Sequence, residues 1–517
     1  MNSVLHEKWK HWRFLFICLF VFSCCTFFSL MSNGLVNSDD GIWEYNHYLA
    51  GKWSIQCGRF VWPYLDRLRM GISPEPITTL ISLGLYTIGV VAILDLFNMK
   101  NRGLISFLTG TLFLSSVSVC ITLSYRFMSP TFALAFVFSV AAVLLIVRIK
   151  NRYLGAGAAG IAIGLSMGLY QAFIGCTCLL LLIYLVIQLF DEKKSLKGVF
   201  TDIVCGLDAG ILGAVIYSLG LKLHLTVFHL TMSDYNGGNE YSLLQSLKVL
   251  PASVINCYTV FKRYFFDNYF KINLFQDYYV LHIFFAFTTI LILIELVRLF
   301  RKEKLRALFA LILLILLPVA SNAVLLIATS AWVSLQMTAA MALIPSVVVI
   351  LLLSVKRKHE IKWIKKALCV LMVFVVFYGN FYQVQIDQEA MRSGIQSTKM
   401  IASEVTAQLI DMNLWDESLV YCFFGNPGQS SMYRLNKVSL RANMYSLFGS
   451  WKSRDYNCSR RSWEGSFHYL LGENIEIGSL MDYQKIIDAY DIDAIPSFPK
   501  QGSIYRYEDI VIIKISD

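Results

Sequence analysis

Long apolar runs separated by short polar segments occupy the chain from residue 13 to residue 382. A run of about 20 apolar residues can cross a hydrocarbon core roughly 30 Å thick as a helix. The apolar stretch over 155–190 is too long for one crossing and carries Tyr170 and Gln171 at its middle, which predicts two short helices that meet there. The pattern predicts eleven transmembrane helices, at 13–31, 77–97, 104–124, 130–148, 154–169, 172–190, 200–223, 277–298, 307–328, 332–354 and 367–382.

The pattern changes after residue 382. From Asp387 onward, charged and apolar residues alternate at the short spacing of a water-soluble domain. We therefore predict a transmembrane domain over 1–382, with outer loops 32–75 and 224–276, and a small extracytoplasmic α/β domain over 383–517. The elements expected in the second domain are a helix over 386–411, a strand over 418–424, helices near 440–450 and 481–489, and a closing hairpin over 503–516.

Composition agrees with a mainly α, polytopic membrane protein. Of 517 residues, 56% are hydrophobic and 15% are charged, and the mean hydropathy is +0.57. The net charge of +10 does not indicate nucleic-acid binding, because Lys and Arg concentrate in alternate loops, as they do on the cytoplasmic side of membrane proteins. The alternation predicts an amino terminus inside and a carboxyl terminus outside, with basic loops at 8–13, 100–102, 148–152, 193–197, 298–306 and 356–366.

The first outer loop, residues 33–75, brings adjacent acids, arginines and tryptophans together just beyond the first apolar run. Asp39 and Asp40 stand near the membrane exit, where a carboxylate keeps access to water and lies within reach of a lipid head group. Such a carboxylate can serve as a general base toward an acceptor hydroxyl. Alternatively, Ser38, Asp39 and Asp40 cap a short interfacial helix over 41–50, and both roles can hold at once.

Several outer residues are candidates for contact with a phosphate or a sugar. Arg59 and Arg126 could hold a phosphate, and Arg126 lies in a tight outer turn where a positive charge runs against the inside bias. Tyr170 and Gln171 could donate hydrogen bonds to a sugar, and Trp43 could stack on one. The alternatives are interfacial anchoring of the arginines and tryptophan and capping of helix ends by the polar pair.

Two classes of site have no support in the sequence. No GxGxxG follows a strand and no GxxxxGK[ST] occurs, which argues against a cytoplasmic nucleotide-sugar enzyme. Most of the twelve cysteines lie in apolar runs without zinc-site spacing, so we assign no metal ligands and no cofactor, although a divalent metal stays open. Pairing of Cys422 with Cys458 also stays open.

Four segments resemble the type II Gtr (GtrII) glucosyltransferase family, whose members modify cell-surface polysaccharides. They are SDDGIWEYNHYLAGKWSIQCGRFVWPYL in the first outer loop, GLYQAF at 168–173, DYNGG at 234–238, and the tail AIPSFPKQGSIYRYEDIVIIKIS. The resemblance implies a GT-C-like fold in the bacterial cytoplasmic membrane. It also implies a polyprenyl-phosphate sugar donor, commonly glucose, and a polysaccharide acceptor, with a flippase and a polyprenyl-phosphate sugar synthase as partners.

By the same resemblance, the acidic pair supplies the catalytic carboxylate and Arg59 is the family's basic position. We slightly favour Asp40 over Asp39 as the base, since neighbours at a helix start point about 100° apart and only one can face the donor. Arg126 joins Arg59 as a phosphate ligand, and an inverting transfer is expected. The residues expected to bind substrate are Trp43, Glu44, Tyr170, Gln171, Asp234 and Tyr235. The alternatives are a transporter or flippase of a lipid-linked saccharide and a non-catalytic assembly partner.

Overall fold

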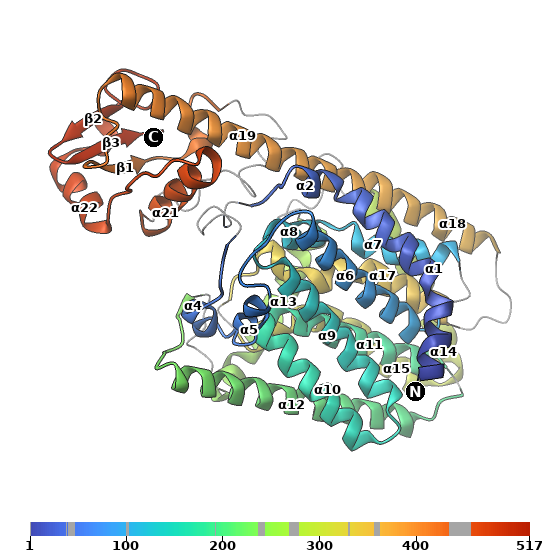
Figure 1. Cartoon of the computed structure of the whole chain (residues 1–517). Helices are drawn as coiled ribbons and strands as arrows, with labels where there is room; N and C mark the ends of the chain where they lie inside the picture. Colours follow the sequence, from blue (N-terminus) through green and yellow to red (C-terminus); the bar gives the residue numbers. More distant parts are fainter. Residues whose placement is uncertain are drawn as a thin grey trace.

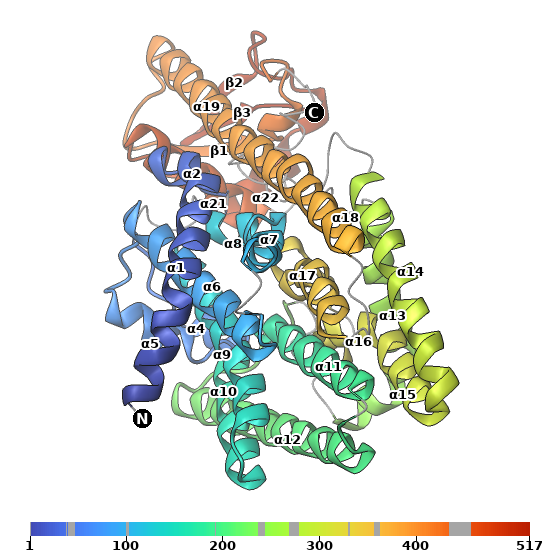
Figure 2. The ribbon, with the colours of Figure 1, turned by 90° about the vertical axis from the view of Figure 1, so that its right-hand side faces the viewer.

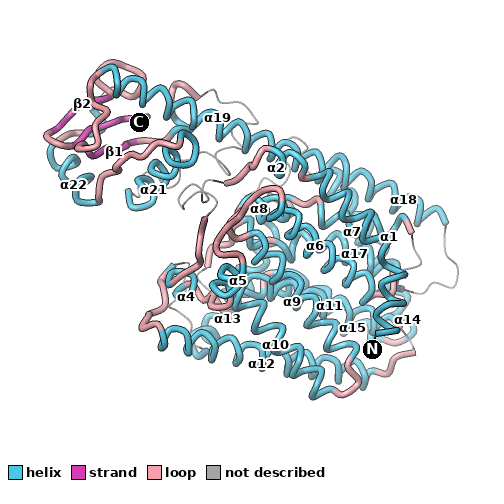
Figure 3. The backbone as a smooth tube through the Cα atoms, viewed as in Figure 1, coloured by secondary structure: helices cyan, strands magenta, loops and turns pink. Residues whose placement is uncertain are grey.

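The chain folds into a helical bundle and a small sheet-containing domain, which stands at the far end of one long helix (Figure 1). The structure is a computed structural model that describes residues 2–37, 39, 47–99, 103–191, 193–235, 243–267, 279–328, 331–355, 362–433 and 456–517. Among these described residues, the strands lie in the second domain (Figure 3). The predicted fold class, mainly helical with a small α/β domain, agrees with this architecture.

Helices occupy the predicted apolar runs, and a further helix, α13 (Leu243–Phe265), lies within the predicted outer loop 224–276. In chain order they are α1 (Asn2–Thr26), α2 (Phe28–Ser32), α6 (Ile77–Leu96), α7 (Leu104–Leu114), α8 (Val117–Ser124), α9 (Ser129–Arg148), α10 (Arg152–Leu169), α11 (Ile174–Phe190), α12 (Leu196–Val227), α13 (Leu243–Phe265), α14 (Tyr279–Lys302), α15 (Lys304–Ile315), α16 (Leu317–Ser321) and α17 (Ala339–Ser354). Among the described residues, six helices are long and apolar enough to cross a membrane, or seven if α7 and α8 form one bent crossing. The number eleven stays a prediction.

Several of these apolar runs are broken rather than straight. Helices α7 and α8 meet at 50°, and α10 and α11 are separated by the 3-10 turn η2 (Gln171–Phe173), as the polar pair predicted. At the α1–α2 break, the Leu30 amide donates to Oε1 of Gln388 at 2.8 Å, while Nε2 of Gln388 donates to the Thr26 carbonyl at 2.9 Å. One glutamine thus supplies hydrogen bonds that the broken helix lacks, and it ties α2 to a helix far along the chain.

That distant helix runs from the bundle into the second domain. It comprises α18 (Lys362–Val373), a π-helical stretch η6 (Phe374–Phe381) and α19 (Tyr382–Asp411), and Figure 2 shows it lying along the edge of the bundle. The helix predicted over 386–411 is therefore the outer part of a longer one. The domain boundary expected at 382–383 falls inside continuous helix, because side-chain polarity can change along a helix without interrupting its backbone.

The second domain is built on a three-stranded sheet in the order β1-β3-β2. Strand β1 (Val420–Phe424) pairs in parallel with β3 (Ile510–Lys514), and β2 (Ile504–Tyr507) pairs antiparallel with β3. Helices α21 (Tyr456–Ser466) and α22 (Leu480–Ala489) lie beside it. The predicted strand, hairpin and 481–489 helix are confirmed, whereas the helix expected near 440–450 lies outside the described residues. Cys422 is a buried free thiol.

Candidate active site

The loop over 33–75, which the sequence predicts to be the first outer loop, closes on itself around a buried carboxylate. It contains two short helices, α4 (Lys52–Gln56) and α5 (Trp62–Leu68), and His47 forms an antiparallel bridge with Ile72. Asp66 is fully buried, accepts a hydrogen bond from the Ala50 amide at 2.9 Å and pairs with Arg69 at 2.7 Å. Residues 47–50 are not helical, so the interfacial helix considered over 41–50 does not extend that far, and 40–46 lie outside the described residues.

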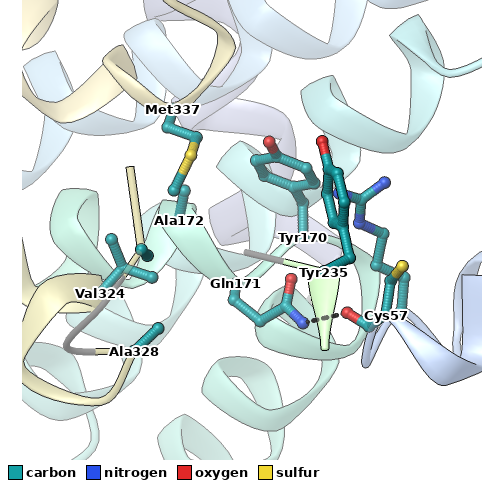
Figure 4. A pocket seen from close by; sticks show the side chains of 10 residues that line it. Cys57, Tyr170, Gln171, Ala172, Tyr235, Val324, Ala328 and Met337 are labelled. Carbon is teal, nitrogen blue, oxygen red and sulfur yellow. Dashed lines mark hydrogen bonds between the residues drawn. The ribbon is translucent and has the colours of Figure 1, made fainter. Parts of the chain in front are cut away.

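The loop is fastened to the turn between α10 and α11. The Val61 amide donates to the Gly168 carbonyl at 3.0 Å, and Nε2 of Gln171 donates to the Cys57 carbonyl at 2.7 Å (Figure 4). Gly58 has φ +80°, and a Cβ there would stand 2.4 Å from Nε2 of Gln171, so this close approach requires glycine. The GRFVW and GLYQAF segments therefore form one unit.

Arg59 follows this turn and lies over a tyrosine. Its guanidinium carbon is 4.8 Å from the Tyr170 ring centroid, a cation–π arrangement, and Nη1 is 3.9 Å from Sδ of Met128. Its Nε is buried and has no hydrogen-bond partner in the described part of the chain. A buried N–H without a partner costs free energy, which a ligand oxygen could offset.

Arg59 and Tyr170 line an open pocket enclosing about 480 Å³. One wall carries the polar side chains, and the facing wall comes from the segments around η4 (Ala323–Leu326) and η5 (Leu335–Met337). In Figure 4 the Tyr235 and Tyr170 rings stand beside each other, and the amide oxygen of Gln171 points away from Cys57. The lining residues are Cys57, Arg59, Tyr170, Gln171, Ala172, Tyr235, Val324, Ala328, Ala331 and Met337.

Asp39 reaches the same region through a short turn anchored on α8. Asn37 donates from its amide to the Ser124 carbonyl at 3.0 Å and from Nδ2 to Oγ of Ser124 at 3.1 Å, and its Oδ1 accepts from the Asp39 amide at 2.9 Å. The Tyr125 hydroxyl donates to the Asp39 carboxylate. Burial raises the pKa of Asp39 to about 6, against the opposing effects of this hydrogen bond and of the Arg59 charge. A carboxyl with that pKa suits general-base work near neutral pH.

The second large outer loop contributes Tyr235. The Ser233 amide donates to the Gln56 carbonyl at 3.1 Å, and the Tyr235 ring meets the Trp53 ring edge-on at 5.8 Å between centroids. Tyr235 is 39% exposed and lines the pocket, whereas its neighbour Asp234 is exposed and does not. The two outer loops therefore meet at the pocket's rim.

Arg126 occupies a different position from Arg59. It is only 3% exposed, and its Nη1 would be 3.9 Å from a Cβ at Gly34. Burial raises the pKa of the Glu75 carboxyl, and hydrogen bonds from Thr79 and the Arg126 charge oppose that shift. Arg126 does not line the pocket.

The structure thus gathers Asp39, Arg59, Tyr170, Gln171 and Tyr235, while Asp40, Trp43 and Glu44 lie outside the described residues. Sequence reasoning missed Asn37, which aims Asp39, and Tyr217, whose hydroxyl accepts from Nε2 of Gln171 at 3.0 Å. It also gave no role to Tyr125. Asn37 carried a signal, since an Asn side chain often accepts a hydrogen bond from the backbone amide two residues on, which here belongs to Asp39.

No group of three or more His, Cys, Asp or Glu side chains in the described part of the chain could hold a metal ion.

The comparison with known families decides what this pocket belongs to. A model of the glucosyl transferase GtrII family matches residues 28–355. The chain belongs to the GtrII glucosyltransferase family. The match includes both outer loops and every residue that lines the pocket, and it ends before α18, so the sheet-containing domain of this GtrII protein lies beyond it. Comparisons with curated proteins and with solved structures give no match.

Proposed function

We propose that this GtrII protein transfers glucose from a polyprenyl-phosphate donor to a hydroxyl of a cell-surface polysaccharide, on the outer face of the bacterial cytoplasmic membrane. The supporting observation is that Asp39, with a pKa of about 6, and Arg59, whose buried Nε has no partner among the described residues, occur together in a chain of the GtrII glucosyltransferase family. A base and a phosphate ligand are the two groups that this transfer requires.

In the proposed reaction, Asp39 takes the proton of the acceptor hydroxyl as its oxygen attacks the anomeric carbon. The bond from that carbon to the phosphate oxygen breaks, and polyprenyl phosphate leaves with both bonding electrons. Arg59 neutralises the charge on the phosphate, and Tyr170 and Tyr235 offer aromatic faces to the sugar. Attack in line on a β-linked donor gives an α-linked product.

The experiment is transfer by the purified, detergent-solubilised protein from synthetic polyprenyl-phosphate glucose to its polysaccharide, with a nucleotide-linked glucose as the parallel donor. We expect release of polyprenyl phosphate from the first donor and none from the second. Equal transfer from the nucleotide sugar would contradict the proposed donor. Movement of a labelled lipid-linked sugar across liposomes without transfer would instead support the transporter alternative.

The proposed topology places the amino terminus in the cytoplasm and residues 383–517 outside. A donor made inside must then be turned outward, so a polyprenyl-phosphate glucose synthase and a flippase are the proposed partners. A reporter enzyme that is active only outside the cytoplasm should be active in cells when it is fused after Asp517. If that fusion were inactive and a fusion of the same reporter at the amino terminus were active, the proposed topology would be wrong.

A further inference from the structure

A second hollow lies deeper among the apolar helices, and it differs from the pocket in its chemistry. It encloses about 860 Å³ and is lined by Ile183, Phe261, Phe285, Thr288, Thr289, Ile292, Leu293, Leu296, Leu311, Leu314, Ile315, Leu317, Ile344, Val348 and Leu351. We call this the apolar groove. Its two hydroxyl side chains are Thr288 and Thr289, and the Thr288 hydroxyl donates to the Phe284 carbonyl at 2.9 Å. With so few polar groups, the groove suits a hydrocarbon occupant.

The apolar groove and the pocket share one helical segment. Ala172 of the pocket and Ile183 of the groove are eleven residues apart on η2 and α11, which form one continuous helical stretch over Gln171–Phe190. Eleven residues make about three helical turns, so Ala172 and Ile183 lie on nearly the same face, roughly 16 Å apart. This segment thus presents one continuous face to both hollows.

The wall between the two levels is tightly packed. A Cβ added at Gly175 of α11 would stand 2.6 Å from the Ser321 carbonyl oxygen of α16 and 3.2 Å from Cβ of Ala340 in α17. Backbone contact at glycine holds the three helices directly against one another, which fixes the position of the apolar groove relative to the pocket.

We propose that the apolar groove binds the polyisoprenyl chain of the donor lipid, while Arg59 in the pocket binds the phosphate of the same molecule. This rests on the proposed function. The argument for this occupant is continuity: a lipid whose phosphate lies at Arg59 meets the groove along the face that η2 and α11 present to both hollows. Bilayer lipid is as apolar as the groove, so burial alone gives little affinity, and the groove acts through packing contacts and by directing the chain.

The test fills the apolar groove from its rim and compares donors of two chain lengths. Leu293 lines the groove and is 50% exposed, and its neighbour Ile294 on α14 is 43% exposed and does not line it. Leu293→Trp should raise KM about tenfold for polyprenyl-phosphate glucose with a long chain, through lost packing contacts. The same variant should leave KM for a short-chain analogue, and kcat for both donors, near the parent values. Ile294→Trp should change neither KM.

The outcomes separate this proposal from the proposed function. If the parent transfers glucose from neither donor, the proposed function fails. If the parent transfers from both and Leu293→Trp leaves the long-chain KM unchanged, or raises both KM values equally, the groove does not hold the donor chain. A phospholipid in the groove would appear in native mass spectrometry as a lipid lost in Leu293→Trp with no change in chain-length preference, which would also overturn the proposal.

Discussion

Two aspartate–arginine sets in the first outer region of the chain differ in how completely they are bonded. Asp66 accepts from Nε and Nη2 of Arg69 and from the Ala50 amide, and Arg69 also donates to Ser73 and to the Phe127 carbonyl. Asp39 and Arg59 lie in the same region, yet Nε of Arg59 has no partner among the described residues. Each guanidinium nitrogen of Arg69 donates within the protein, whereas Nε of Arg59 can still donate to a ligand.

Burial affects both carboxyls alike, but their hydrogen-bond partners differ. It raises the pKa of Asp39 and the pKa of Asp66. In the Asp66 set, however, each nitrogen of the Arg69 guanidinium donates within the protein, so the pair holds the loop closed. In the Asp39 set, the Arg59 guanidinium rests on the Tyr170 ring and lines the pocket, whereas the Asp39 carboxylate does not line it and accepts from the Tyr125 hydroxyl. Among the described residues, the unpartnered Nε of Arg59 distinguishes this arginine from Arg69.

The largest expected effect comes from Asp39→Asn. The change keeps side-chain size and removes the base, so kcat for sugar transfer should fall about 10²- to 10⁴-fold, with protein yield and donor binding retained. The matched Asp66→Asn should instead lower the yield of folded protein, because it leaves Arg69 without a buried counter-charge. Single-turnover transfer and thermal unfolding measure the two effects.

A rate of sugar transfer in Asp39→Asn close to the parent rate would contradict the role of Asp39 as the base. If Asp40→Asn then lost the rate, the base would be Asp40, which the sequence slightly favoured and which lies outside the described residues. If neither single variant nor the double variant lost the rate, the acidic pair would serve as a turn or cap, and the general-base mechanism would be wrong.

The next effect compares the two arginines. Arg59→Ala removes a charge-assisted contact to phosphate worth about 1.5–3 kcal/mol, or roughly ten- to a hundredfold in donor affinity, with little change in unfolding temperature. Arg69→Ala leaves Asp66 as an unpaired buried charge and should destabilise the fold by about 3–5 kcal/mol. In the purified variants, donor affinity should fall more in Arg59→Ala, whereas the unfolding temperature should fall more in Arg69→Ala. If one variant had both the larger loss of affinity and the larger loss of unfolding temperature, the assignment would be contradicted.

The sequence predicted what depends on local pattern. Apolar run length placed the helices, and the polar pair at Tyr170 and Gln171 placed the α10–α11 turn. It named Arg59 and Arg126 as phosphate ligands, but it could not show that the Arg69 guanidinium is already bonded, because that depends on partners such as the Phe127 carbonyl, 58 residues away. The Gln171 amide likewise takes its orientation from Tyr217 and Cys57. Residues distant in sequence decide which polar groups stay available.

The smallest effect tests the hydrogen bond from Tyr125. Asp39 acts as a base only when deprotonated, so kcat/KM for the parent should rise with pH through a midpoint near 6. The Tyr125 hydroxyl stabilises the carboxylate, and its removal in Tyr125→Phe raises the pKa, which moves the acidic limb to higher pH. Near pH 8 both proteins are deprotonated, and their rates should agree within about threefold. Tyr64→Phe, which removes the hydroxyl bonded to His224, is the control and should leave the limb in place. An unchanged limb in Tyr125→Phe, or a limb moved to lower pH, would mean that this hydroxyl does not tune the base and that Asp39 is not the group whose ionisation limits transfer.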